Sequence, residues 1–219
     1  MTVTRRLGVF GGTFDPIHFG HLDAADAAER ALGLDEILFV PSHDPPHRSV
    51  EPHASAFHRF ALVALAIDGR RSWHTSDLEV SREGPSYTAD MLRTLHACGW
   101  RGSQIFFILG ADAFAEIATW REFPAVLDLA HFAVVARPGT TLAAAAARTP
   151  VLGSRMRPVS DARGELVDPT LFLVEAPTRD VSSTAIRARR VSGMRIDDLV
   201  PPAVALHIVA HGLYGKESC

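Results

Sequence analysis

Cysteine is scarce in this chain of 219 residues, which contains only Cys98 and Cys219. Two cysteines this far apart form neither the disulfide framework of a small secreted domain nor a CxxC metal site. No apolar run is long enough to cross a bilayer, and the segment that follows Arg5 and Arg6 is too short for a secretion signal. These absences predict a cytoplasmic protein with no membrane partner.

A net positive charge is also missing, because 22 Lys and Arg residues stand against 25 Asp and Glu residues and the formal charge is −3. No basic field would hold a nucleic-acid backbone, so nucleic acid is not expected as a partner and any phosphate must be bound by local groups. Apolar residues make up 47% of the chain, as in an ordinary globular protein. We therefore expect residues 1–219 to form a single domain. The sequence leaves its oligomeric state open, and a homo-oligomer is possible.

Short apolar runs alternate with helical segments along the chain. Strands are expected at 7–10, 35–41, 104–110, 131–138 and 171–176, an extended segment at 73–80, and helices at 20–32, 55–67, 86–97 and 201–211. The spacing of the first two strands is that of a parallel βαβ unit. We predict an α/β fold that is Rossmann-like and doubly wound, with a mainly parallel sheet and helices on both faces. Residues 139–168 match no element and are expected to form a surface excursion.

A glycine-rich segment, GGTFDPIHFGH at 11–21, runs from the first strand into the first helix. Such a turn offers backbone N–H groups and a positive helix end to an anion, although it is neither GxGxxG nor a P-loop. His18 and His21 lie three residues apart with Gly20 between them, so both rings can grip a triphosphate. The alternative is a capping His18 and a packed His21, while a metal site lacks a third ligand. Asp15 is expected to order the loop by an Asx-type hydrogen bond, with a catalytic role left open.

A second anion site is indicated by VSSTAIR at 181–187, after the last strand. The Ser and Thr residues are good helix N-caps, and Arg187 lies one turn further along the same face. Hydroxyls, N–H groups and a guanidinium can therefore converge on one phosphate. Alone this segment would be an ordinary capped helix, so its weight comes from its pairing with the first site.

Together these segments resemble the HxGH nucleotidyltransferases. PSHDPPHR at 41–48, GPSYTADML at 84–92, ILGADAFAEIATWREFPAVL at 108–127 and VPPAVALHIVAHGLY at 200–214 are similar, in order, to segments of the bacterial nicotinate-nucleotide adenylyltransferases. The resemblance covers nearly the whole chain and departs from the family in 139–168. It implies that the AMP part of ATP is joined to nicotinate mononucleotide, with Mg²⁺ bound mainly through the ATP phosphates and no metal ligands from the protein.

The resemblance also implies a role for individual residues. The groups that hold the reacting phosphates would be His18, His21 and Arg187. The remaining ATP-binding residues would be Gly11, Gly12, Thr13, Phe14, Gly20, Asp112, Ser183 and Thr184. The mononucleotide would be bound by His47, Arg48, Thr88, Trp120 and Arg137. Two alternatives remain open: the same chemistry on nicotinamide mononucleotide or phosphopantetheine, and a nucleotide-binding regulator without catalysis.

Overall fold

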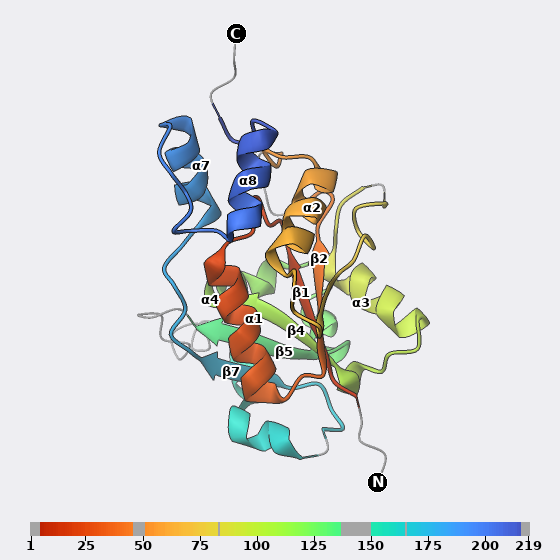
Figure 1. The fold of residues 1–219 in the computed structure, drawn as a ribbon. Helices are drawn as coiled ribbons and strands as arrows, with labels where there is room; N and C mark the ends of the chain where they lie inside the picture. The colour runs from red at the N-terminus through yellow and green to blue at the C-terminus, as the bar shows by residue number, and fades with distance from the viewer. Residues whose placement is uncertain (1–4, 46–50, 83, 137–149, 165, 216–219) are drawn as a thin grey trace.

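A seven-stranded parallel sheet forms the centre of the molecule (Figure 1). The computed structural model describes residues 5–45, 51–82, 84–136, 150–164 and 166–215. The strand order is β3-β2-β1-β4-β5-β7-β6, and every pairing between neighbours is parallel. The strands are β1 (Leu7–Gly12), β2 (Glu36–Pro41), β3 (Trp73–Thr75), β4 (Ile105–Gly110), β5 (His131–Ala136), β6 (Met156–Pro158) and β7 (Leu171–Glu175).

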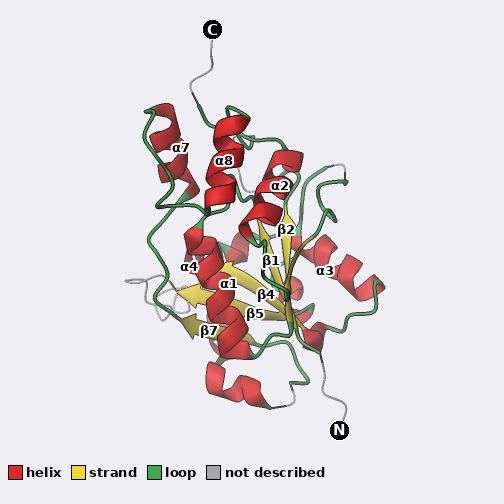
Figure 2. Ribbon diagram, viewed as in Figure 1, coloured by secondary structure: helices red, strands yellow, loops and turns green. Residues whose placement is uncertain are grey.

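Helices connect these strands and cover both faces of the sheet (Figure 2). They are α1 (Phe19–Leu32), α2 (Ala56–Ala66), α3 (Thr88–Ala97), α4 (Ala111–Ala115), α6 (Pro150–Gly153), α7 (Ser183–Val191) and α8 (Pro202–Ala210). Local signals set their ends: α1 stops at Gly33, whose φ of 60° is left-handed, and the Ser55 side chain caps α2 by accepting from the His58 N–H.

The two faces of the sheet bury two separate hydrophobic cores. Phe106 and Ile108 of β4 pack with α1, α2, α7 and α8, whereas Ile105, Phe107 and Leu109 of the same strand pack with α3 and α4. Successive side chains of a strand point to opposite faces of the sheet. The alternation of β4 residues between the two cores therefore shows that this strand is buried on both faces. The prediction of a doubly wound Rossmann-like fold is confirmed.

The predicted elements differ from the observed ones mainly at the edges of the sheet. The expected extended segment at 73–80 is a strand only over Trp73–Thr75. In the stretch expected to be a surface excursion, the described residues form α6, the edge strand β6 and a short 3₁₀ helix, Val159–Arg163. Leu152 and Ala162 are buried there, so this stretch contributes to both cores.

The strand order places a crevice at the carboxyl ends of β1 and β4. From β1 the chain adds β2 and β3 on one side, and then crosses over to build β4, β5, β7 and β6 on the other. Loops that follow β1 and β4 therefore lead away in opposite directions. In open α/β sheets this switch point is where ligands bind.

His131, at the start of β5, makes folding sensitive to acid. Its ring stacks on Phe106 with centroids 4.7 Å apart, its Nδ1 accepts the Thr170 N–H, and burial lowers its pKa to about 4. The unfolded chain takes up this proton below about pH 6.5 and the folded chain only near pH 4, so stability is lost as the pH falls through this window. We expect a loss of about 3 kcal/mol from this residue.

The measurement is the free energy of unfolding in urea between pH 7 and pH 4, for the parent chain and for His131→Leu. The variant should show a flatter pH dependence, whatever its stability at pH 7. Substitution of the exposed His74 by leucine is the matched control and should leave the slope as it is in the parent chain. Equal slopes for the parent chain and His131→Leu would contradict the assignment.

Candidate active site

A cavity of about 360 Å³ lies at the crevice between the ends of β1 and β4. Its walls include Val40 of β2, Leu109 of β4 and Val135 of β5, together with the loop after β1. Nine of the residues expected at the site line this cavity: Gly11, Gly12, Thr13, Phe14, Gly20, His21, Thr88, Asp112 and Trp120. The structure thus brings together residues that lie up to about a hundred positions apart in the sequence.

Close packing shapes the glycine-rich loop between β1 and α1. A Cβ on Gly12 would lie 3.1 Å from the Phe14 ring, and a Cβ on Gly20 would lie 3.1 Å from both the Arg179 carbonyl oxygen and His18 Nδ1. Arg179 is held there by bonds from its N–H and guanidinium to Asp23, which keep the pKa of that carboxyl below its usual value. Glycine at position 20 therefore lets the 178–181 segment lie directly against the start of α1.

The two histidines at the start of α1 are stacked, with ring centroids 3.7 Å apart. His18 is the N-cap residue of α1 and is buried, whereas His21 lines the cavity. His21 Nδ1 accepts the backbone N–H of His18, so the neutral His21 ring carries its proton on Nε2. His18 thus has the position of a helix cap, and His21 can donate a hydrogen bond from its other nitrogen.

The start of α7 is bonded to the β1–α1 loop. Ser183 Oγ donates to the Pro16 carbonyl, and Arg187 donates to the Asp15 carbonyl at 2.7 Å and to Thr184 Oγ1 at 3.3 Å. The Arg187 side chain is only 15% exposed. Among the described residues that line the cavity, none belongs to α7. In this structure Ser183, Thr184 and Arg187 support the loop from behind.

Asp15 is the centre of this support. Its carboxylate is fully buried and accepts hydrogen bonds from the backbone N–H groups of His53 and Ala54 and from the Tyr214 hydroxyl. The His53 ring and the Arg187 guanidinium lie 3.3 Å and 3.9 Å from it. We expected an Asx-type hydrogen bond within the loop. Instead, the buried carboxylate contacts three distant segments, at residues 53–54, 187 and 214.

Arg59 of α2 is a site residue that the sequence analysis missed. The residue is 1% exposed, and its guanidinium donates to the carbonyl oxygens of Thr13, Ser42, His43 and Ala54 at 2.6–3.1 Å. The available signal was its helical spacing to Leu62 and Val63, which places a charge on the buried face of an amphipathic helix.

The opposite wall of the cavity comes from α3, α4 and the segment after α4. Thr88 is the first residue of α3, Asp112 lies in the first turn of α4, and Trp120 packs edge-on against Phe107 with centroids 5.9 Å apart. Glu79 and Thr178, two further buried polar residues in the cavity wall, were not anticipated from the sequence. His47, Arg48 and Arg137, expected to bind the mononucleotide, lie outside the described residues.

A glycine loop, a histidine at a helix entrance and a cavity at the switch point of a parallel sheet define a nucleotide-binding site of the nucleotidyltransferase class. The cytidylyltransferase-like family model matches residues 9–189. A relative from Roseiflexus sp. strain RS-1 is 40% identical, and the match covers 95% of this chain and 97% of the relative. A relative from Desulfitobacterium hafniense strain Y51 is 37% identical, and the match covers 96% of each chain. Both are named "Probable nicotinate-nucleotide adenylyltransferase". The chain belongs to the nicotinate-nucleotide adenylyltransferase family.

The fold is also similar to that of a solved structure. The Plasmodium falciparum nicotinic acid mononucleotide adenylyltransferase, solved in complex with NaAD, superposes with a TM-score of 0.70 at 19% identity, covering 96% of this chain and 97% of its own. No helix among the described residues is long and apolar enough to span a membrane.

Proposed function

We propose that this chain transfers the AMP part of ATP to nicotinate mononucleotide, giving nicotinate adenine dinucleotide and pyrophosphate, a step of NAD biosynthesis. The observation that carries the proposal is the cavity, which unites the glycine loop and His21 with Thr88 and Trp120 in a chain of this family. The compartment proposed for the reaction is the cytoplasm, where the exposed thiol of Cys98 is kept reduced.

The chemistry is an in-line displacement at the α-phosphorus of ATP. A phosphate oxygen of the mononucleotide forms the new P–O bond while the bond to the pyrophosphate oxygen breaks, and pyrophosphate leaves with its electrons. The attacking phosphate is already a nucleophile, so the protein supplies positioning and charge stabilisation. In this proposal His21 donates from Nε2 to a phosphate oxygen in the transition state.

The other residues divide between the two substrates. The loop from Gly11 to Phe14 and the backbone at Gly20 would hold the ATP phosphates, and Asp112 would bind its ribose. Thr88 and Trp120 would contact the mononucleotide. Ser183, Thr184 and Arg187 would act mainly by fixing the loop, since their side chains bond to Asp15 and Pro16 or within α7. His18 would do so by stacking on His21. His47, Arg48 and Arg137 stay predictions.

Mg²⁺ is proposed as the metal that accompanies ATP. Within the described ranges no group of three His, Cys, Asp or Glu side chains could hold a metal ion. The ion would arrive on the ATP phosphates and keep several waters, because Mg²⁺ is commonly bound through substrate phosphates. The ion would neutralise the charge that develops on the leaving pyrophosphate.

The test is pyrophosphate release from ATP and Mg²⁺ with one acceptor at a time: nicotinate mononucleotide, nicotinamide mononucleotide or phosphopantetheine. We expect the highest kcat/KM with nicotinate mononucleotide and a dinucleotide product of the corresponding mass. Faster release with another acceptor would overturn the substrate. ATP binding without release for any acceptor would overturn catalysis and support a regulator.

A further inference from the structure

We infer that Arg59 is a positioning residue of the adenylyl-transfer site, which fixes the Thr13–Phe14 peptide so that the Phe14 N–H is turned toward the cavity as a donor to a phosphate oxygen. The inference rests on the proposed function for the identity of the anion. Arg59 does not line the cavity itself, so its effect passes through the loop.

The bonds of Arg59 join the three segments behind the cavity. Its Nη1 donates to the Thr13 carbonyl at 2.8 Å and to the Ser42 carbonyl at 2.6 Å, its Nη2 to the His43 carbonyl at 3.0 Å, and its Nε to the Ala54 carbonyl at 3.1 Å. These carbonyls belong to the loop after β1, the segment after β2 and the approach to α2. A buried guanidinium is costly to desolvate, and here its donors are matched by carbonyl oxygens that would otherwise be unsatisfied.

The orientation of the Thr13–Phe14 peptide follows from its planarity. In a trans peptide the C=O and the N–H point in opposite directions. The Thr13 carbonyl points at Arg59, behind the loop, while Thr13 and Phe14 both line the cavity. The Phe14 N–H therefore points away from Arg59, and it takes part in none of the hydrogen bonds found among the described residues.

The backbone of Phe14 needs such a fixed neighbour. Its φ of 48° lies in the left-handed region, which a phenylalanine adopts only when the surroundings hold it there. The Phe14 ring is 2% exposed and packs edge-on against Phe10 and His21, with centroids 5.5 Å and 5.1 Å away. Ring packing on one side and the Arg59 bond on the other thus hold this peptide in place. Turns of this kind gather N–H groups into anion-binding concavities.

Lysine cannot replace Arg59 in this role. A guanidinium carries five N–H donors in a rigid plane, whereas an ammonium has three donors around one point at the end of a flexible chain. Four carbonyls spread over three segments match the first geometry. Arg59→Lys keeps the charge and much of the volume, so it separates the loss of fixed donors from the loss of charge.

The experiment follows the Phe14 amide directly in the full chain. Thr13–Phe14 is the one Thr-Phe pair in the sequence, so labelling Thr with ¹³C at the carbonyl and Phe with ¹⁵N selects a single amide signal. We expect titration with pyrophosphate to shift this signal in a saturable way in the parent chain. In Arg59→Lys we expect a smaller shift, and a kcat for dinucleotide formation lower by about 10²-fold, with KM for the mononucleotide changed by no more than about threefold.

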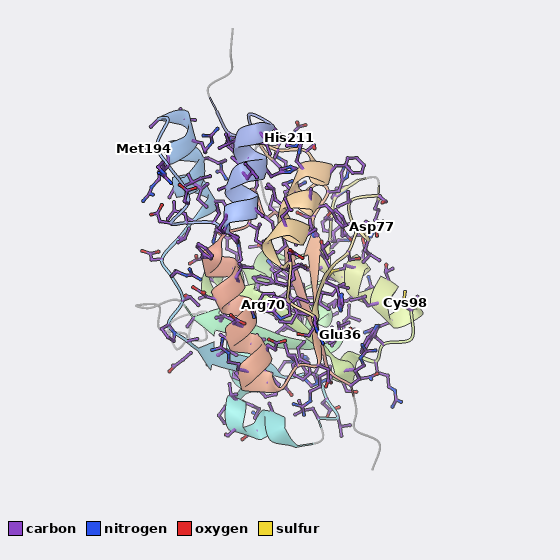
Figure 3. All side chains as sticks on the ribbon, in the orientation of Figure 1. Glu36, Arg70, Asp77, Cys98, Met194 and His211 are labelled. Atoms are coloured by element: carbon purple, nitrogen blue, oxygen red, sulfur yellow. The ribbon has the colours of Figure 1, made fainter. Side chains whose placement is uncertain are left out.

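Arg70→Lys is the matched control. Arg70, labelled in Figure 3 beside α1, donates to both carboxylate oxygens of Asp26 at 2.6 Å and 3.0 Å and is not among the residues that line the cavity. The Arg70→Lys substitution should leave the response of the Phe14 signal to pyrophosphate and the kcat as they are in the parent chain. If the Phe14 amide of the parent chain does not respond to pyrophosphate, the inference is overturned, even if Arg59→Lys fails to fold. It is also overturned if Arg59→Lys folds and shows the same amide shift and the same kcat as the parent chain. Absence of turnover in the parent chain would instead count against the proposed function, and the amide titration would still decide the role of Arg59.

Discussion

Replacing His21 by alanine is expected to lower kcat for dinucleotide formation by about 10²–10³-fold while the fold is retained. His21 lines the cavity, and its Nδ1 accepts the His18 N–H, which fixes the orientation of the ring toward a bound phosphate. A donor that is already oriented stabilises developing charge without reorganisation, and alanine removes it. The measurement is steady-state kinetics with ATP and nicotinate mononucleotide, with circular dichroism to verify folding.

His96→Ala is a suitable control for this substitution. His96 is also partly buried and bonded to backbone, since its Nε2 lies 2.9 Å from the Leu129 carbonyl oxygen, but it is not among the residues that line the cavity. It should keep kcat within about twofold of the parent value. If His21→Ala behaved like His96→Ala, the histidine would be a packing residue of the loop and the catalytic role would be refuted.

Replacing Asp15 by alanine is expected to destabilise the fold by about 3–5 kcal/mol, the cost of removing one partner from a buried ionic group. Arg187 would lose its nearest carboxylate, and the N–H groups of His53 and Ala54 would lose their acceptor. The measurement is urea unfolding at pH 7 with an unchanged m-value.

Tyr214→Phe provides the graded comparison for Asp15. Burial and the neighbouring Asp15 carboxylate raise the pKa of Tyr214, so the phenol keeps its proton and donates to Asp15 at 2.9 Å. Loss of that hydroxyl alone should cost about 1 kcal/mol, because the ring stays packed and the carboxylate keeps its other donors. A loss for Asp15→Ala no larger than that for Tyr214→Phe would contradict the central place given to the carboxylate.

The fold was predictable because its signals are local. Apolar runs of strand length and amphipathic helical segments identified the central strands and the helices that cover them, and the βαβ spacing predicted parallel pairing. The edge strand β6 was not predicted, because three residues, Met156–Pro158, carry no periodic pattern of their own. It is defined by its parallel pairing with β7, a partner that comes from a later part of the chain.

The candidate site was predictable in part. Glycines and His21 were identified because their spacing in one short segment has direct chemical meaning. Arg59 and the bonds of Asp15 were not, because their partners come from other parts of the chain: Arg59 reaches back 46 residues to Thr13, and Asp15 reaches forward 172 residues to Arg187. A single sequence shows the residue type at such positions but not the partner that gives it a role.

The bond between Asp15 and Tyr214 has a consequence for the order of biosynthesis, since it spans 199 residues. A growing chain can pair β1 with β2 and β4 long before residue 214 has been made, because those strands lie within the first half of the sequence. The loop that leads to His18 and His21 acquires its buried partner Tyr214 only when the segment after α8 docks. A nascent chain on the ribosome would thus hold a nearly complete sheet before this segment has all of its buried partners, and we expect activity only after residue 214 has emerged and docked.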